Sequence, residues 1–161
     1  MEVTTMLRKE KGFTLIELLI VVAIIGIIAA IAVPNLLTAI QRSKRSRTAA
    51  DLRAIGTALG SYNVDNNQFP TSGAGVTTAN ATALFTILRA QGHYQGSTAD
   101  GWNNTYLYWG DASGYTLVSY GKDNATGPAI TGDGLGANDD FDYDVIYING
   151  GFVAPPYIAQ Q

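Results

Sequence analysis

One uninterrupted hydrophobic run dominates the N-terminal part of the chain. Residues 13–33 (FTLIELLIVVAIIGIIAAIAV) are 21 residues with a single charge, Glu17, and as a helix they would span about 30 Å, the thickness of a bilayer's hydrocarbon core. Pro34 follows directly, and a proline inside a helix removes one backbone hydrogen bond and favours a kink. The pattern predicts a helix over residues 13–33 that can cross a membrane.

Downstream of this run the hydrophobic positions become periodic. Leu52, Ile55, Leu59 and Tyr62 recur at spacings of three and four, which places them on one face of a helix. We therefore expect one long helix over residues 13–64, with an amphipathic second half that packs this stripe against the protein's own sheet.

Residues 65–161 are expected to form a globular head. After a loop rich in Asn, Gly and Thr, residues 81–92 favour a short helix. Aromatic and β-branched runs then predict three strands, the first two joined as a hairpin by a five-residue loop, at 105–109, 115–120 and 145–148. So small a sheet needs a hydrophobic partner, and the long helix is the only sizeable candidate. The expected fold class is α+β, a long N-terminal α-helix packed on a small antiparallel β-sheet.

Composition excludes several kinds of site. The 161 residues allow one modest domain beside the membrane segment, and the chain has no cysteine and one histidine, His93. Disulfides, thiolate metal sites, cysteine nucleophiles and multi-histidine metal centres are therefore ruled out.

Charge is partitioned along the chain. Residues 42–53 carry a net charge of +4, and residues 54–161 carry −7. The basic run RSKRSR at 42–47 could contact anionic lipid headgroups or the phosphates of a nucleic acid. We favour a solvated run that pairs with acidic residues of neighbouring subunits, so nucleic acid is not an expected partner. The short basic stub before the membrane run favours an N-terminus in the cytoplasm.

Glu17 is the first informative site. A carboxylate inside an apolar membrane segment costs a few kcal/mol and needs a positive partner. From the residues alone two interpretations stay open. Either the segment is a signal anchor with Glu17 near the cytoplasmic face, or Glu17 has a positive partner, for which Lys9 or Lys11 could reach back in an uncut chain.

Residues 11–37, which begin KGFTLIELLIVVAIIGIIAAIAVPNL, resemble the N-terminal signature of type IV pilins and type II secretion pseudopilins. The resemblance implies that residues 1–12 are a leader removed by a prepilin peptidase between Gly12 and Phe13. It also implies N-methylation of Phe13, whose new amine pairs with Glu17 of a neighbouring subunit in a helical filament. The stretch between Gly26 and Pro34 can lose helical hydrogen bonds when the subunit enters the fibre.

The same resemblance implies the partners and the location. The chain would be a homo-oligomer drawn from the inner membrane by an assembly ATPase and platform proteins. It would then stand in a periplasmic pseudopilus or an extracellular pilus. The segment 13–33 would serve first as the transmembrane helix and then as the filament core.

The acidic stretch at 122–145 is a candidate calcium site, because calcium prefers hard oxygen ligands on flexible backbone. Its aspartates do not match an EF-hand, since the glycine and glutamate that the motif requires are missing. The segment 100–141 is similar to major pseudopilins, whose head loop binds calcium. That similarity names Asp123 and Asp139 or Asp140, with the carbonyl of Tyr120, as ligands. The alternative is a solvated acidic loop.

We expect a non-enzymatic filament subunit, most similar to the major pseudopilin that acts as a type II secretion piston. One alternative is the major pilin of an extracellular type IV pilus, and another is a monomeric membrane-tethered binding module. Enzyme motifs are weak: GDGLGA at 132–137 precedes aspartates instead of opening a helix, and no G-x-S-x-G elbow is present.

Overall fold

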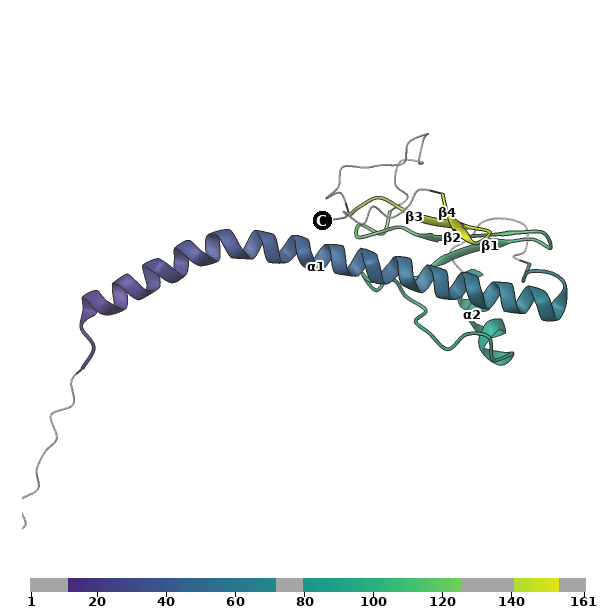
Figure 1. Cartoon of the computed structure of the whole chain (residues 1–161), viewed down its shortest axis with the longest axis horizontal. Coiled ribbons are helices and arrows are strands. Elements are labelled where there is room, and N and C mark those ends of the chain that lie inside the picture. The colour runs from purple at the N-terminus through teal and green to yellow at the C-terminus, as the bar shows by residue number, and fades with distance from the viewer. Residues whose placement is uncertain (1–11, 72–79, 126–140, 154–161) are drawn as a thin grey trace, which may run out of the picture. The chain divides into compact units, whose positions relative to one another are not determined.

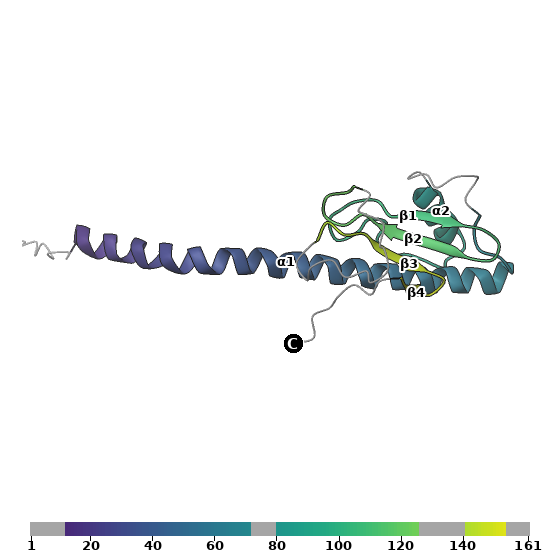
Figure 2. The same cartoon turned by 90° about the horizontal axis from the view of Figure 1, so that it is seen from above.

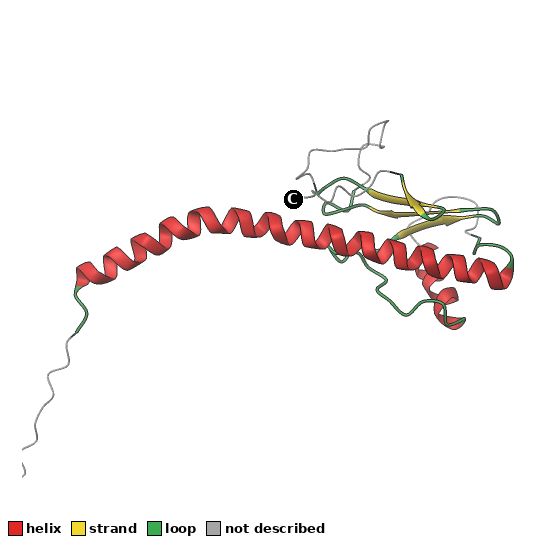
Figure 3. Ribbon diagram, in the orientation of Figure 1, coloured by secondary structure: helices red, strands yellow, loops and turns green. Residues whose placement is uncertain are grey.

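The computed structural model describes residues 12–71, 80–125 and 141–153. The chain divides into two compact units, Met1–Leu37 and Thr38–Gln161, which are described separately below. The described helices and strands are α1 (Leu15–Asn66), α2 (Asn80–Ala90), β1 (Leu107–Gly110), β2 (Tyr115–Ser119), β3 (Val145–Ile148) and β4 (Gly151–Phe152) (Figure 1). Figure 3 shows the same elements coloured by type and confirms the expected α+β class.

Helix α1 is 52 residues long and confirms the long helix expected from the hydrophobic pattern. Pro34 lies inside it, and the helical assignment continues without a break on both sides. The helix ends where Asn67 adopts a left-handed conformation with φ of 54°, a conformation that asparagine tolerates better than most residues. The start and the end both lie two residues later than expected.

The four strands form one antiparallel sheet in the order β1-β2-β3-β4. The β1–β2 hairpin and β3 confirm two expectations, although β1 begins two residues later than expected and the hairpin loop has four residues. Strand β4 was not expected. It follows a two-residue turn in which Asn149 and Gly150 have φ of 46° and 93°, the positive values that a tight hairpin turn of this kind requires.

The core of the second unit lies between the sheet and one face of α1, with α2 beside β1 (Figure 2). The expected stripe is confirmed: Leu52, Ile55 and Leu59 are fully buried, and Tyr62 packs against them while half-buried. The other core residues come from α2, the strands and the segment before β1, and are Ala58, Ala81, Leu84, Phe85, Leu88, Tyr94, Tyr106, Tyr108, Tyr115, Leu117, Val145 and Tyr147.

The N-terminal unit has the opposite character. Its helical residues are apolar, with a mean hydropathy of 3.1 over the most hydrophobic window, and none of that window is buried within the chain. In this unit every large hydrophobic side chain from Leu15 to Leu37 is exposed. A surface of this kind is stable only when lipid or other protein covers it.

Candidate functional site

The first candidate site is the N-terminus of α1, where Thr14 and Glu17 form a capping box. The Glu17 carboxylate accepts hydrogen bonds from the Thr14 backbone N–H (2.8 Å) and from the Thr14 hydroxyl (2.6 Å). The Glu17 backbone N–H in turn donates to the Thr14 hydroxyl oxygen (3.3 Å). This reciprocal pair satisfies backbone donors that the first helical turn leaves unpaired. The spacing T-x-x-E was a signal for it that our sequence reasoning did not use.

The capping box leaves the charge of Glu17 without a cation. Both hydrogen-bond donors from Thr14 are neutral, and among the residues that the structure describes no basic side chain forms an ion pair with Glu17. An ionised carboxylate offers about four acceptor positions, and the hydrogen bonds from Thr14 occupy two of them. The carboxylate therefore keeps acceptor capacity for a positive group brought by another molecule.

The expected processing site immediately precedes this cap. Gly12 and Phe13 lie before the helix and are exposed, and the Phe13 side chain is 85% accessible. Residues 1–11 lie outside the described part of the chain. Gly26 and Pro34 lie within α1, and the space beside the Gly26 backbone is open. Their expected role in a fibre stays a prediction.

The second candidate site is the base of the acidic loop, which we define as residues 119–122 and 141–143. The Lys122 backbone N–H donates to the Phe141 carbonyl (3.0 Å), and the Lys122 ammonium lies 4.0 Å from Asp142. Gly121 has φ of 67°, and a Cβ there would lie 2.7 Å from the Phe141 carbonyl oxygen. Only glycine fits this close approach, so the chain enters and leaves the loop at one place.

Of the four expected calcium ligands, the structure describes two. Tyr120 lies at the loop base, and Asp123 follows it with an exposed carboxylate that accepts the Ala125 backbone N–H (3.1 Å). Asp139 and Asp140 lie outside the described residues. Within the described residues, no group of three or more carboxylate or histidine side chains is close enough together to hold a metal ion.

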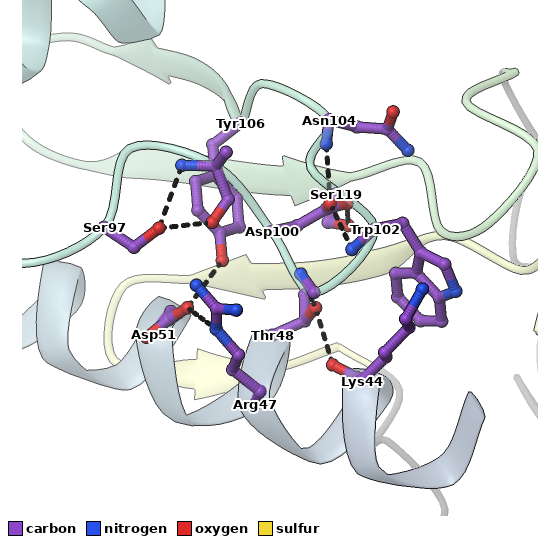
Figure 4. A network of polar contacts seen from close by, with 12 residues as sticks. Lys44, Arg47, Thr48, Asp51, Ser97, Asp100, Trp102, Asn104, Tyr106 and Ser119 are labelled. Atoms are coloured by element: carbon purple, nitrogen blue, oxygen red, sulfur yellow. Dashed lines mark hydrogen bonds and ion pairs between the residues drawn. The ribbon is translucent and has the colours of Figure 1, made fainter. Parts of the chain in front are cut away.

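A buried aspartate that sequence reasoning did not single out lies beside the loop base (Figure 4). Asp100 is 2% exposed, and its carboxylate accepts the backbone N–H groups of Trp102 (2.9 Å) and Asn104 (2.8 Å) and the hydroxyl of Ser119 (2.6 Å). Asp100 begins a turn-forming Asp-Gly pair, but Asp133 does so too, so nothing in the sequence separates Asp100 from the other aspartates of the head.

The basic residues that follow the apolar part of α1 make contacts within the same chain. The Arg45 guanidinium lies 5.0 Å from the centre of the Phe141 ring, and Arg53 lies 4.9 Å from that of Phe152. Arg47 lies 3.6 Å from Asp51 on the same helix. The two cation–π contacts join α1 to the turn before β3 and to β4, whereas the Arg47–Asp51 pair lies within α1. The expected pairing with neighbouring subunits stays a prediction.

His93 has a structural environment. Its Nε2 atom lies 3.6 Å from Asp65 at the end of α1, and its ring meets Tyr62 edge-on at 5.8 Å.

A hollow of about 610 Å³ lies between α2 and residues 98–105, and its described lining is mostly threonine and alanine with Arg89, without a carboxylate or a histidine. The motif GDGLGA falls outside the described residues.

Comparisons with known proteins agree with this arrangement. A family model described as "Type II secretion system (T2SS), protein G" matches residues 35–136, and one described as "Prokaryotic N-terminal methylation motif" matches residues 7–33.

Curated relatives carry the name type II secretion system core protein G. The Vibrio cholerae relative is 33% identical over 140 residues, which cover 81% of this chain and 92% of the relative. The Escherichia coli relative is 32% identical over 125 residues, 74% of this chain and 86% of the relative, and the Pseudomonas aeruginosa relative is 32% identical over 126 residues, 74% and 89%. The chain belongs to the type II secretion system core protein G family.

Proposed function

We propose that this chain is a structural subunit of a type II secretion pseudopilus, a helical filament of many copies assembled from the inner membrane. One observation carries the proposal: the head buries its own core, whereas α1 leaves an apolar surface exposed from Leu15 to Ile40 with one carboxylate in it. In the precursor lipid would cover this surface, and in the filament the same surface of other subunits would replace the lipid. We expect no catalytic step.

The register of the filament would come from Glu17. Cleavage between Gly12 and Phe13 by a prepilin peptidase would create a free, methylated amine at Phe13, and this amine would meet Glu17 of the neighbouring subunit. Charges attract more strongly at low dielectric than in water, although a buried pair specifies position more than it stabilises. The neutral donors of the capping box support this role, because they hold the carboxylate at the start of the helix and leave its charge for the neighbour.

Two substitutions separate the charge of Glu17 from its capping role. Glu17→Gln removes the charge and keeps an oxygen that can accept the Thr14 N–H, whereas Thr14→Val removes the hydroxyl and keeps the charge. We expect Glu17→Gln to abolish filaments in cells, with membrane insertion, cleavage and head stability unchanged. Thr14→Val should retain filaments at reduced yield. Normal filaments in Glu17→Gln would refute the register.

Mass spectrometry of the first peptide tests the processing. A peptide that begins with methylated Phe13 supports assembly, and an intact Met1 supports the monomeric membrane-tethered module instead. Electron microscopy distinguishes the two filament roles. Short periplasmic filaments support the secretion piston, and long surface fibres made mainly of this chain support the extracellular pilus.

Calcium at the acidic loop is the second part of the proposal. The chemistry of the site fits, because the loop base closed by the Lys122–Phe141 hydrogen bond carries the Tyr120 carbonyl and leads directly to Asp123, and both groups are hard oxygen ligands. Asp139 or Asp140 would complete the ligand set. A bound ion would neutralise the carboxylates and hold the two ends of the loop together.

Thermal melting of the head tests calcium directly, because a ligand that binds only the native state raises the melting temperature. Trp102 and Trp109 are the chain's two tryptophans and both lie in the head, so their fluorescence reports its unfolding in the full chain in detergent micelles. We expect calcium to raise the melting temperature relative to EDTA, and Asp123→Asn to remove the increase. Asp65→Asn, an exposed carboxylate at the end of α1, is the control that should retain it. An unchanged midpoint in the unsubstituted protein would refute the site.

A further inference from the structure

We propose that Asp100 is a positioning residue that sets the geometry of the acidic loop's base through its hydrogen bonds with Ser119 and Asn104, and not as a calcium ligand. The inference rests on the proposed calcium site, because the loop base is the part of the described structure that carries Tyr120 and leads to Asp123. Asp100 acts through Ser119 and Asn104, which contact Gly121 directly. Figure 4 shows Asp100 between Ser119 and the backbone of the turn that ends at Asn104.

The direction of each hydrogen bond at Asp100 is fixed by chemistry. An ionised carboxylate only accepts, so the Ser119 hydroxyl must donate its proton to Asp100, at 2.6 Å. The other carboxylate oxygen accepts the backbone N–H groups of Trp102 and Asn104. In the described part of the chain no basic side chain forms an ion pair with Asp100, so hydrogen bonds stabilise this buried charge.

The fixed proton on Ser119 determines how Gly121 is held. With its proton committed to Asp100, the Ser119 oxygen presents its lone pairs and accepts the Gly121 N–H at 3.3 Å. The Asn104 side-chain amide donates to the Gly121 carbonyl at 2.8 Å. Both backbone polar groups of Gly121 are therefore set by residues that Asp100 orients, and Gly121 is the glycine against which the returning chain packs.

The turn that carries Asp100 also rests on α1, but through different atoms. The Gly101 N–H donates to the Thr48 hydroxyl oxygen (2.9 Å), and the Trp102 indole N–H donates to the Gln41 side chain (2.6 Å). Removing the Thr48 hydroxyl should disturb the packing of the turn on the helix and leave in place the hydrogen bonds that Asp100 accepts from Ser119 and Asn104. Thr48→Val is therefore a matched control for the effect of Asp100 on the loop base.

Asp100→Asn is the decisive substitution. The asparagine oxygen can still accept the two backbone N–H groups, but its NH₂ group then faces Ser119 and reverses that hydrogen bond. The Ser119 oxygen must then accept hydrogen bonds from both the new amide and the Gly121 N–H, and the Ser119 hydroxyl no longer has a carboxylate to donate to. We therefore expect the hydrogen bond from Gly121 to weaken. Asn104→Ala is a second, less buried substitution that removes the donor to the Gly121 carbonyl and keeps the backbone bond to Asp100.

The test compares these variants with the unsubstituted full chain in detergent micelles. It uses CaCl₂ as the probe, with tryptophan fluorescence for melting and hydrogen exchange at the Gly121 and Lys122 amides. We expect Asp100→Asn to raise the apparent Kd of calcium about five- to tenfold, the effect of losing roughly one hydrogen bond. Exchange at these amides should quicken about tenfold even in EDTA. Asn104→Ala should change both in the same direction.

A merely structural role predicts a different result. Thr48→Val should lower the melting temperature in EDTA while the calcium-dependent increase and the exchange at Gly121 stay unchanged. If Asp100→Asn and Asn104→Ala behave in that way too, the positioning role is overturned. If the unsubstituted chain shows no calcium response, the calcium proposal is overturned instead, and the exchange rates in EDTA alone decide whether Asp100 holds the loop base.

Discussion

Two glycines on the same helix offer a sharp test of how the sheet packs on α1. Gly56 is buried, and a Cβ there would collide with the Tyr147 ring and lie 2.9 Å from the Tyr115 hydroxyl. Gly60, one turn later, is exposed, and a Cβ there would meet nothing within 4 Å. We therefore expect Gly60→Ala to stabilise the head and Gly56→Ala to leave it less stable than Gly60→Ala.

The magnitude follows from two effects. In a helix interior alanine is favoured over glycine by about 1 kcal/mol, and both substitutions share this gain. Gly56→Ala also forces the Tyr147 ring to move, and that ring is 7% exposed and packs against Phe152 with 4.8 Å between ring centres. Overpacking of this kind costs about 1–3 kcal/mol. Because the shared gain cancels, the two variants should differ by about 1–3 kcal/mol.

Urea denaturation of the full chain in micelles, followed by tryptophan fluorescence, measures this difference. The midpoint of Gly60→Ala should lie above that of the unsubstituted protein, and the midpoint of Gly56→Ala should lie at or below it, with equal slopes. Equal stability of the two alanine variants would mean that Tyr147 does not pack against the helix backbone at Gly56, and the reasoning would be wrong.

Three further outcomes are expected for the head. Burial raises the pKa of Tyr94 and of Tyr115 to about 12, so these tyrosines ionise at lower pH in the unfolded chain than in the folded one. The free energy of unfolding should therefore be constant below pH 10 and then fall by about 1.4 kcal/mol per pH unit for each tyrosine. Urea midpoints that stay constant to pH 12 would contradict this. Tyr108→Phe removes a buried hydrogen bond to the Pro70 carbonyl (2.6 Å) and should cost about 1–2 kcal/mol in urea denaturation, whereas an unchanged midpoint would count against that bond. Asn149→Ala and Asn149→Gly both lose the hydrogen bond from the Tyr115 N–H, but only alanine is strained at the positive φ of this position. Asn149→Ala should therefore cost at least about 1 kcal/mol more stability than Asn149→Gly, and equal melting temperatures of the two variants would exclude the strain.

The elements governed by local pattern could be predicted from the sequence. The spacing of Leu52, Ile55 and Leu59 specified the buried face of α1, because helical periodicity depends only on neighbours in the chain. Strand β3 was found for a similar reason, as a short aromatic and β-branched run. The family resemblance at the N-terminus was equally local, since its motif is contiguous.

The elements missed depend on turn chemistry or on distant partners. Strand β4 has only two residues, too few for a pattern, although the Asn149–Gly150 pair before it is a strong hairpin signal that we did not use. Asp100 gains its significance from Ser119, which is 19 residues away, and from burial by the folded head. A sequence shows neither the distance nor the burial, so one aspartate looked like the others.

The closed base of the acidic loop also bears on how this protein can diverge. Because Lys122 and Phe141 are hydrogen-bonded to each other, the sheet on either side is insensitive to how much chain joins them. The entropy of closing a loop depends only weakly on its length, at about 0.6 kcal/mol for each doubling. Insertions and deletions between the proposed ligands Asp123 and Asp139 should therefore accumulate among homologues while the strands stay in register, which makes the chain between these two residues a suitable place to graft a peptide tag.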